Sequence, residues 1–309
     1  MSVTKMYFVH CLTPTHMGIG RGLGYIDLPI DRDKVTQWPI IRGSALKGVL
    51  ADFHHAAPGQ RANDSLSRIA FGIPGDAQNS ANSGSLIFTD AQLVCLPVRS
   101  LFGTFAWVTS PLCLDKLRRT LGTVLPQHEL NTLTIPPAKD KGVVSQHNVT
   151  LVQGDNIYLE DLDLQVEQRA QATAWADKLA QWVFPGHSDW INSFIQRFAI
   201  VPDDVFTFLC QTGTEVHTRV RIDDDTKTVA QGALWTEESL PAESILMGLV
   251  HCQRVYANGS NQAGINCEQL IDKFASGTVL LQIGGKATVG RGQARIIFSE
   301  SVASTSGAH

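Results

Sequence analysis

The chain lacks the features that mark several common protein classes. None of its six cysteines forms a CxxC pair, so neither a structural zinc site nor a disulfide framework is expected. It has no run of about 18 or more apolar residues, which argues against a membrane-spanning helix. The first residues also show no charged leader followed by an apolar core and a cleavage site. We therefore expect a cytoplasmic protein without a membrane partner.

Charge of either sign is scarce. Charged residues make up 17% of the 309 residues, and 25 Lys and Arg stand against 29 Asp and Glu, for a net charge of -4. A uniformly basic, histone-like surface is excluded, so any nucleic acid must bind a local basic groove on an acidic body. Hydrophobic residues make up 43%, which supplies a core and argues against a disordered chain.

Familiar nucleotide and hydrolase motifs are missing as well. Two glycine-rich loops, at 18–24 and 284–292, fit neither GxGxxG nor the P-loop pattern, and GxSxG is absent. Each loop carries cations, which are Arg21 in the first and Lys286 and Arg291 in the second. Because glycine lets a backbone approach a phosphate and a cation neutralises it, the loops are candidates for phosphate contacts. The alternative is a pair of structural turns.

What is present predicts a mixed α+β fold. Strands are expected at 4–12, 85–96, 103–109, 196–201, 215–222, 244–253, 279–283 and 293–298, with short pieces near Thr150 and Tyr158. Helices are expected at 44–56, 111–121, 165–183, 203–211 and 265–275. Strands that return antiparallel to cover helices are typical of a sandwich of ferredoxin type.

The pattern predicts one domain over residues 1–300 and a disordered tail at 301–309. Irregular insertions are expected at about 56–84 and 122–195, and a projecting ribbon at about 223–241. The segment from Thr13 to Arg42 is too long for an ordinary connector. Its apolar residues predict that it is packed and ordered in part; they are Tyr25, Ile26, Ile30, Trp38 and Ile40.

The segment from Arg42 to Gly48 predicts an anion site at the start of a helix. Ser44 is the expected N-cap, and the unpaired N–H groups of a first turn attract anions. Lys47 lies in that turn, where a cation opposes the helix dipole unless it faces a phosphate. A lysine on a solvated face is the alternative.

Asp27, His16 and one of two adjacent glutamates are candidates for acid–base chemistry. Asp27, within YIDLP, is a possible metal ligand or base, and the alternative is an aspartate that stabilises its own turn. His16 is a candidate acid or base at neutral pH, with polar packing as the alternative. Glu237 and Glu238 are adjacent in a strand, so at most one of them faces a given site. Asp31, Arg32 and Asp33 are interpreted as a solvated charge cluster.

Several segments together resemble the RAMP proteins of CRISPR systems, and within them the backbone subunits of type III-B (Cmr) effector complexes. They are THMGIGRGLGYIDLPIDRD (15–33), WPIIRGSALKGVLAD (38–52), LFGTFAWVTSP (101–111), GALWTEESLP (232–241) and IGGKATVGRGQARI (283–296). The similarity runs from about residue 4 to 298 and is weak at 56–84 and 122–195.

The resemblance implies a single RAMP-type domain, a modified ferredoxin-like (RRM-like) palm whose ribbon at 223–241 is a thumb. It implies that copies of the chain stack along a guide RNA beside other Cmr subunits. Complementary single-stranded target RNA is then cleaved at regular intervals with a divalent metal, Mg²⁺ or Mn²⁺, shared with the substrate phosphates. The aspartate that this family needs for cleavage corresponds to Asp27, which is also the metal residue, and His16 and Glu238 are the further catalytic candidates. The implied guide RNA contacts are Arg21, Arg42, Ser44, Lys47, Arg219, Arg221, Lys286 and Arg291.

Three other functions stay open on the sequence alone. The first is a guide-binding scaffold that leaves cleavage to another subunit, and the presence of Asp27 argues against it. The second is a metal-independent ribonuclease that processes guide RNA with a histidine, for which His16 is compatible. The helix containing LKG and the ribbon favour a backbone subunit instead. The third is a small-molecule enzyme with a glycine-lined pocket, against which copurifying RNA would count.

Overall fold

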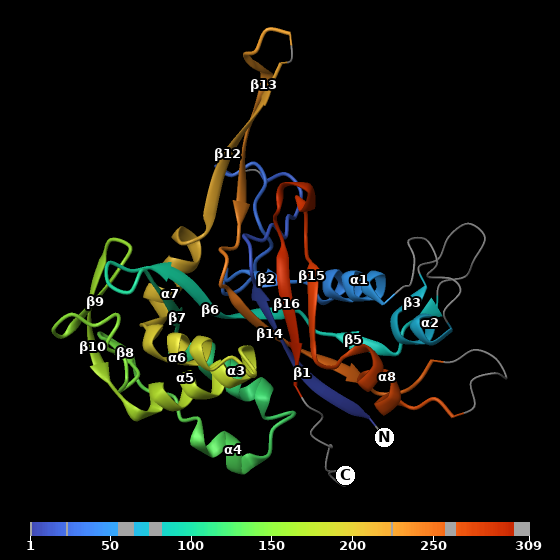
Figure 1. Cartoon of the computed structure of the whole chain (residues 1–309), viewed down its shortest axis with the longest axis horizontal. Coiled ribbons are helices and arrows are strands. Elements are labelled where there is room, and N and C mark those ends of the chain that lie inside the picture. The colour runs from blue at the N-terminus through green and yellow to red at the C-terminus, as the bar shows by residue number, and fades with distance from the viewer. Residues whose placement is uncertain are drawn as a thin grey trace.

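Most strands of this protein join one large sheet that carries helices on both faces (Figure 1). The computed structural model describes residues 2–22, 24–54, 65–73, 82–223, 225–256 and 264–299. The strands are β1 (Val3–Cys11), β2 (Ile40–Ile41), β3 (Gly72–Ile73), β4 (Asn82–Ser83), β5 (Leu86–Phe88), β6 (Ala91–Arg99), β7 (Phe105–Thr109), β8 (Gly142–Val144), β9 (Asn156–Leu159), β10 (Leu162–Gln168), β11 (Phe198–Ile200), β12 (Glu215–Ile222), β13 (Val229–Ser239), β14 (Ile245–Cys252), β15 (Thr278–Gln282) and β16 (Gln293–Phe298). The helices are α1 (Gly43–Phe53), α2 (Ser65–Phe71), α3 (Pro111–Leu121), α4 (Gln127–Thr132), α5 (Ala170–Val183), α6 (Ser188–Arg197), α7 (Asp203–Thr212) and α8 (Cys267–Phe274).

The main sheet has twelve strands in the order β15-β16-β1-β14-β6-β7-β11-β8-β10-β9, with β2 paired to β6 and β5 to β14. All neighbours are antiparallel except the pairs β7–β11 and β8–β10. The expected α+β class is therefore confirmed. None of the helices within the described ranges is long and apolar enough to cross a membrane.

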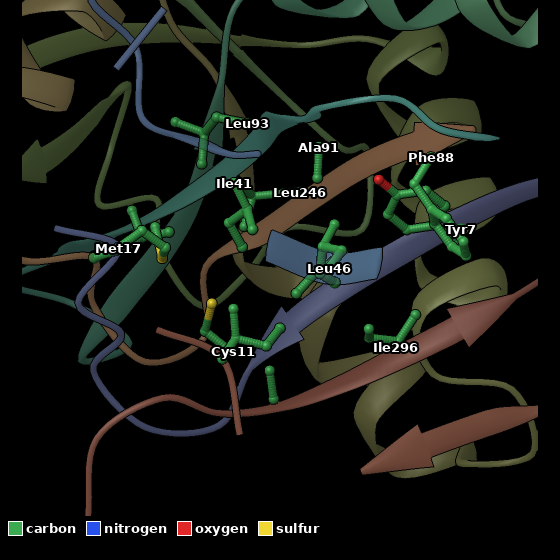
Figure 2. Packing of buried hydrophobic residues seen from close by; sticks show 14 of the residues in the cluster. Tyr7, Cys11, Met17, Ile41, Leu46, Phe88, Ala91, Leu93, Leu246 and Ile296 are labelled. Carbon is green, nitrogen blue, oxygen red and sulfur yellow. The ribbon is translucent and has the colours of Figure 1, made fainter. Parts of the chain in front are cut away.

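Side chains alternate along β1 between two hydrophobic clusters, because successive residues of a strand face opposite sides of the sheet. Tyr7 and Val9 lie in the first cluster, with residues of α1, α2, α7 and α8. Met6 and Phe8 lie in the second, with residues of α3, α4, α5 and α6. Figure 2 shows part of the first cluster, in which Leu46 of α1 lies with residues of β1, β14 and β16.

Residues 122–195, expected as an irregular insertion with a helix at 165–183, consist largely of regular elements, from α4 to most of α6. The helix expected from residue 165 begins at Ala170, because Leu162–Gln168 is a strand that pairs with β9 and β8. The buried rings of Trp175 and Phe194 show that this segment supplies part of the second cluster. The ribbon extends further than expected, since the predicted strand at 215–222 forms one hairpin with β13 that projects from the sheet (Figure 1).

The long segment from Thr13 to Arg42 is anchored in the first cluster. Ile30, Trp38 and Met17 are buried there, and the Trp38 indole N–H donates to the hydroxyl of Thr207 on α7 at 3.1 Å. The expectation of a packed, ordered loop is confirmed for these residues. It is wrong for Tyr25, whose side chain is fully exposed. The surface segment at 56–84 and the tail at 301–309 fall mostly or wholly outside the described residues.

Ser44 is not the N-cap of α1. The helix begins at Gly43, so the cap position belongs to Arg42, which makes no side-chain capping bond. Asp90, in the turn between β5 and β6, caps the helix from outside, because its Oδ1 accepts the Gly43 N–H at 2.8 Å. The exposed Ser44 is already the second helical residue.

This assignment of the cap predicts different effects of two alanine substitutions. Asp90→Ala should lower the free energy of unfolding of the isolated subunit by about 1–2 kcal/mol, the usual cost of losing a helix cap. Ser44→Ala should change it by less than about 0.5 kcal/mol, as expected for a surface substitution. Denaturant unfolding of both variants measures the difference. Equal losses in the free energy of unfolding would contradict the assignment of the cap to Asp90.

Candidate active site

Two segments far apart in the chain lie side by side at the base of the hairpin. The loop around Leu28 runs parallel to β13, where the Leu28 N–H donates to the Thr236 carbonyl and the Leu28 carbonyl accepts from the Glu238 N–H, both at 3.0 Å. Thr15 and Leu240 exchange two more backbone hydrogen bonds, of 2.8 and 2.9 Å. The loop therefore occupies the edge of β13 that β12 leaves open.

The closing glycine-rich loop packs against the same segment. The N–H of Gly285 donates to the His16 carbonyl, and that of Gly292 donates to the Pro14 carbonyl, both at 3.0 Å. Gly284 has φ +78°, and a Cβ there would lie 2.3 Å from the His16 carbonyl oxygen, so only glycine fits. The interpretation of these glycines as structural turns is thus supported for this position.

Asp27 is exposed, and its carboxylate bonds the hairpin instead of its own turn. Oδ2 accepts from the backbone N–H of Thr236 at 2.8 Å and from the Thr236 hydroxyl at 2.9 Å. These two hydrogen bonds, with a smaller contribution from the positive charge of Arg21, hold the pKa of Asp27 below its usual range. The carboxylate is consequently ionised at neutral pH.

His16 is buried, with 7% of its surface exposed, and is held in one tautomer. Its Nδ1 lies 2.6 Å from the backbone carbonyl oxygen of Glu238. Since a carbonyl only accepts, Nδ1 carries the hydrogen, and Nε2 of the neutral ring bears the lone pair. Nε2 lies against Gly18, where a Cβ would come within 2.4 Å of it. The ring therefore needs a glycine at residue 18.

Glu238 is buried, with 2% of its surface exposed, and both carboxylate oxygens are occupied. Oε1 accepts from the Arg32 guanidinium at 2.5 Å and from the Thr214 hydroxyl at 2.8 Å, and Oε2 accepts from the Ile30 N–H at 3.0 Å. These contacts anchor the first loop to the hairpin, and the catalytic role expected of Glu238 stays a prediction. Arg32 also donates to the Cys210 carbonyl at 2.9 Å, so the interpretation of Arg32 as part of a solvated cluster is wrong.

Glu237 faces a different set of partners from Glu238, as their adjacent places in a strand predict. Lys286 lies 2.6 Å from its Oε1, and Arg219 lies 3.5 Å from its Oε2. Burial acts to raise the pKa of Glu237, but hydrogen bonds from Lys286 and the Trp235 indole outweigh it and leave the pKa below its usual value. Two cations predicted to bind RNA are thus already paired with one carboxylate.

The remaining predicted RNA-binding cations divide into two groups. Arg42 makes two bonds to the carboxylate of Asp31, of 2.6 and 3.0 Å, and one to Asp90, and Arg291 pairs with Glu215 at 3.2 Å. The other group has no ion-pair partner within the described ranges; its members are Arg21, Lys47 and Arg221.

Lys47 stands out within that second group. It is partly buried on the first turns of α1, and burial lowers the pKa of its ammonium. A half-buried cation without a carboxylate is favourable where an anion completes the site.

Two residues that hold the site together were missed in the sequence. Thr236 orients Asp27, and Arg32 neutralises the buried Glu238. Their partners lie 209 and 206 residues away along the chain, so no local spacing marks them. The pattern TEE offered a signal only for the glutamates.

Comparison with known proteins identifies relatives of this chain. The sequence model of the RAMP superfamily matches residues 8–295. The chain is 32% identical, over 99% of both chains, to the CRISPR system Cmr endoribonuclease Cmr4 of Pyrococcus furiosus, and 23% identical to the CRISPR system CMR subunit Cmr4 of Saccharolobus solfataricus, over 93% of this chain and 94% of the relative.

Solved structures share the fold. The crystal structure of oligomeric Cmr4 from Pyrococcus furiosus has a TM-score of 0.72 at 26% identity, covering 98% of this chain and 99% of the other. A cryo-EM structure of type III-B Cmr-beta bound to cognate target RNA contains a chain with a TM-score of 0.70 at 21% identity, covering 96% of both chains. The match to the superfamily over nearly the whole chain and the full-length identity to the Pyrococcus protein lead to one conclusion: this chain belongs to the RAMP superfamily and, within it, to the Cmr4 family of CRISPR systems.

Proposed function

We propose that the chain is a repeating backbone subunit of a type III-B CRISPR effector in the cytoplasm. It binds guide RNA and cleaves complementary target RNA at regular intervals. Copies of the chain form a filament with other Cmr subunits. The single observation that carries the proposal is the ionised carboxylate of Asp27, which is exposed and oriented by two hydrogen bonds from Thr236 at the base of the hairpin.

The order of the strands supports a ferredoxin-like palm. In this reading β1, α1, β5–β6, β14, α8 and β16 form the βαββαβ unit, and the neighbours β16-β1-β14-β6 are all antiparallel. Both crossover helices contribute to the first cluster, as that unit requires. The β12–β13 hairpin then projects as the thumb (Figure 1).

The guide is gripped through its phosphates, because base pairing with the target does the reading. The strongest candidates are the cations without an ion pair in the described part of the chain, and Lys47 at the start of α1 is foremost among them. The paired cations, among them Lys286 and Arg219, contribute to the surface potential while holding the closing loop and the hairpin together.

The chemistry assigned to Asp27 follows from its pKa. A carboxylate whose pKa lies below the usual range is a weak proton acceptor, so orienting and charge-balancing roles suit Asp27 better than that of general base. His16 presents Nε2 for proton transfer, because its Nδ1–H is bound to a carbonyl.

A divalent metal fits this site only as an ion shared with substrate. No group of three or more metal-ligating side chains occurs within the described part of the chain. The Oδ1 of Asp27, which lies outside the bonds to Thr236, together with substrate phosphate oxygens, would hold a hydrated Mg²⁺ or Mn²⁺. Such an ion supplies charge neutralisation at the phosphate and lowers the pKa of an attacking hydroxyl.

Asp27→Asn tests the proposal in the complex reconstituted with guide RNA. The wild type should cut a complementary RNA into an evenly spaced ladder with Mg²⁺ or Mn²⁺ and not with EDTA. The variant should lose at least about 100-fold in rate while still binding target, because its size is unchanged and its charge is gone.

Asp33→Asn is the matched control for that experiment. Asp33 lies in the same loop and also accepts hydrogen bonds from a threonine, but that threonine is Thr36 of the loop itself and not a residue of the hairpin. It should leave the ladder intact. A ladder that persists in Asp27→Asn would make this chain the non-catalytic scaffold.

Thr236→Val tests how Asp27 is held ionised. The change removes the hydroxyl bond to Oδ2, so the pKa of Asp27 should rise toward its usual value. Because cleavage requires the ionised form, the acid limb of the rate–pH profile should move to higher pH, whereas ionisation at neutral pH should not change, since the usual pKa of an aspartate lies far below 7. Thr218→Val, the cross-strand neighbour, should leave the acid limb unchanged.

Lys47→Ala tests the guide contact. Binding of guide RNA measured over a range of salt concentrations should weaken, and the slope of log affinity against log salt should fall by about 1, as for the loss of one phosphate contact. Lys34→Ala, an exposed lysine of the long loop, should leave the slope unchanged. An unchanged slope in Lys47→Ala would place Lys47 off the guide path.

A further inference from the structure

Tyr25 has an unusual position for an aromatic side chain. Its relative exposure is 104%, and no other large apolar side chain in the described ranges is more exposed. Burying an aromatic ring contributes strongly to stability, so a ring left entirely in water gains nothing for the fold. Its position, two residues before Asp27, suggests a role in what the site binds.

The backbone that carries this ring is fixed. The carbonyl of Tyr25 lies 3.4 Å from the Thr236 hydroxyl, and the N–H of Asp27 donates to the same hydroxyl at 2.9 Å. The Asp27 carbonyl also accepts from the Gly22 N–H at 2.9 Å. The ring therefore projects from a loop that the hairpin holds in register with the carboxylate.

The hairpin supplies an apolar surface beside this position. Residues two apart in a strand share a face, so Leu234 faces the same side as Thr236, and the cross-strand register adds Val220 opposite Leu234. Leu234 and Val220 are 63% and 45% exposed. Figure 1 shows the N-terminal loop beside the base of the hairpin.

An unpaired nucleobase is the ligand that best fits the exposed ring of Tyr25 and the apolar face beside it. Exposed aromatic side chains bind single-stranded RNA by stacking on bases that have left the helical stack. In cleavage by the 2′-hydroxyl of the nucleotide on the 5′ side, a 2′-O–P bond forms, the P–O5′ bond to the next nucleotide breaks and the leaving 5′-oxygen takes up a proton. The attack must be in line with the bond that breaks, which requires the attacking nucleotide to depart from helical geometry. Its displaced base then requires a surface, and Tyr25 offers one next to the carboxylate.

We propose that Tyr25 is a base-stacking residue for the target nucleotide on the 5′ side of the scissile phosphate, with Leu234 and Val220 forming the adjoining apolar wall. This inference rests on the proposed function, in that it requires target RNA to be cleaved at Asp27. It adds a contact to the base, whereas the remaining candidates of the site contact phosphates or protons.

The test is a chemical double-mutant cycle within one cleavage ladder. Targets carry either a normal nucleotide or an abasic ribonucleotide at one cleavage position, and the other positions serve as internal controls. Tyr25→Ala should slow cleavage of the normal target by roughly 5- to 100-fold, as for the loss of one base–aromatic stack. The abasic substitution should slow the wild type to a similar extent at that position alone, and Tyr25→Ala should slow the abasic position no further.

Variants that keep or spare the ring complete the experiment. Tyr25→Phe and Tyr25→Trp should cleave like the wild type, because stacking needs the ring and not the hydroxyl. Val35→Ala removes another strongly exposed apolar side chain of the same loop and should have no effect. Wild-type cleavage by Tyr25→Ala, or effects of the variant and the abasic position that multiply, would overturn the inference.

Two further outcomes separate the alternatives. If Tyr25 instead contacts a second copy of the chain, Tyr25→Ala should reduce the mass of the assembled complex without target and slow the abasic position as much as the normal ones, and the inference fails. If Asp27→Asn retains the ladder, the proposed function itself fails, whatever Tyr25 does. If Asp27→Asn loses the ladder but the effects of Tyr25→Ala and of the abasic position multiply, only the stacking role is rejected and the proposed function stands.

Discussion

A carboxylate removed from water must keep its hydrogen-bond donors, and the site of this protein is built around one such group. Glu238 receives donors from Arg32, from Thr214 and from the backbone of Ile30, and its own carbonyl accepts from His16. Loss of any donor would leave a buried charge partly unsatisfied. This cost keeps the first loop, the residues after α7 and the hairpin in one arrangement. That arrangement places Asp27 beside Thr236.

The same hairpin carries two adjacent glutamates that bond two different loops. Glu238 faces inward and holds the first loop, whereas Glu237 faces Lys286 and Arg219 and holds the closing loop. Both glycine-rich loops thus converge on β13, although most of the chain separates them. A chain with a net charge of -4 can bind RNA in this way, because some cations are neutralised by pairing while others, such as Lys47, have no ion-pair partner among the residues that the structure describes.

Local patterns in the sequence predicted the elements that depend on neighbours in the chain. Helix α3 starts at Pro111 as expected, with Ser110 capping it through the Cys113 N–H, and the strand expected at 215–222 has the bounds of β12 to within a residue. The prediction was wrong where pairing across the sheet overrode local propensity, as at Leu162–Gln168, which pairs with β9 although its composition suits a helix. Ser44 was wrong for a similar reason, since the cap is supplied from Asp90, on another element.

The sequence by itself determined the α+β class, the family resemblance, the two glycine-rich loops and the candidacy of Asp27, because each depends on residue types at short spacing. Only the tertiary structure decided which cations are already paired, that the carboxylate of Glu238 is buried among hydrogen-bond donors, that Thr236 bonds Asp27 and that the side chain of Tyr25 is exposed. Hydrogen bonds and burial depend on distances between residues some 200 positions apart. The order of residues does not set those distances until the sheet has formed and the loop has docked against its hairpin.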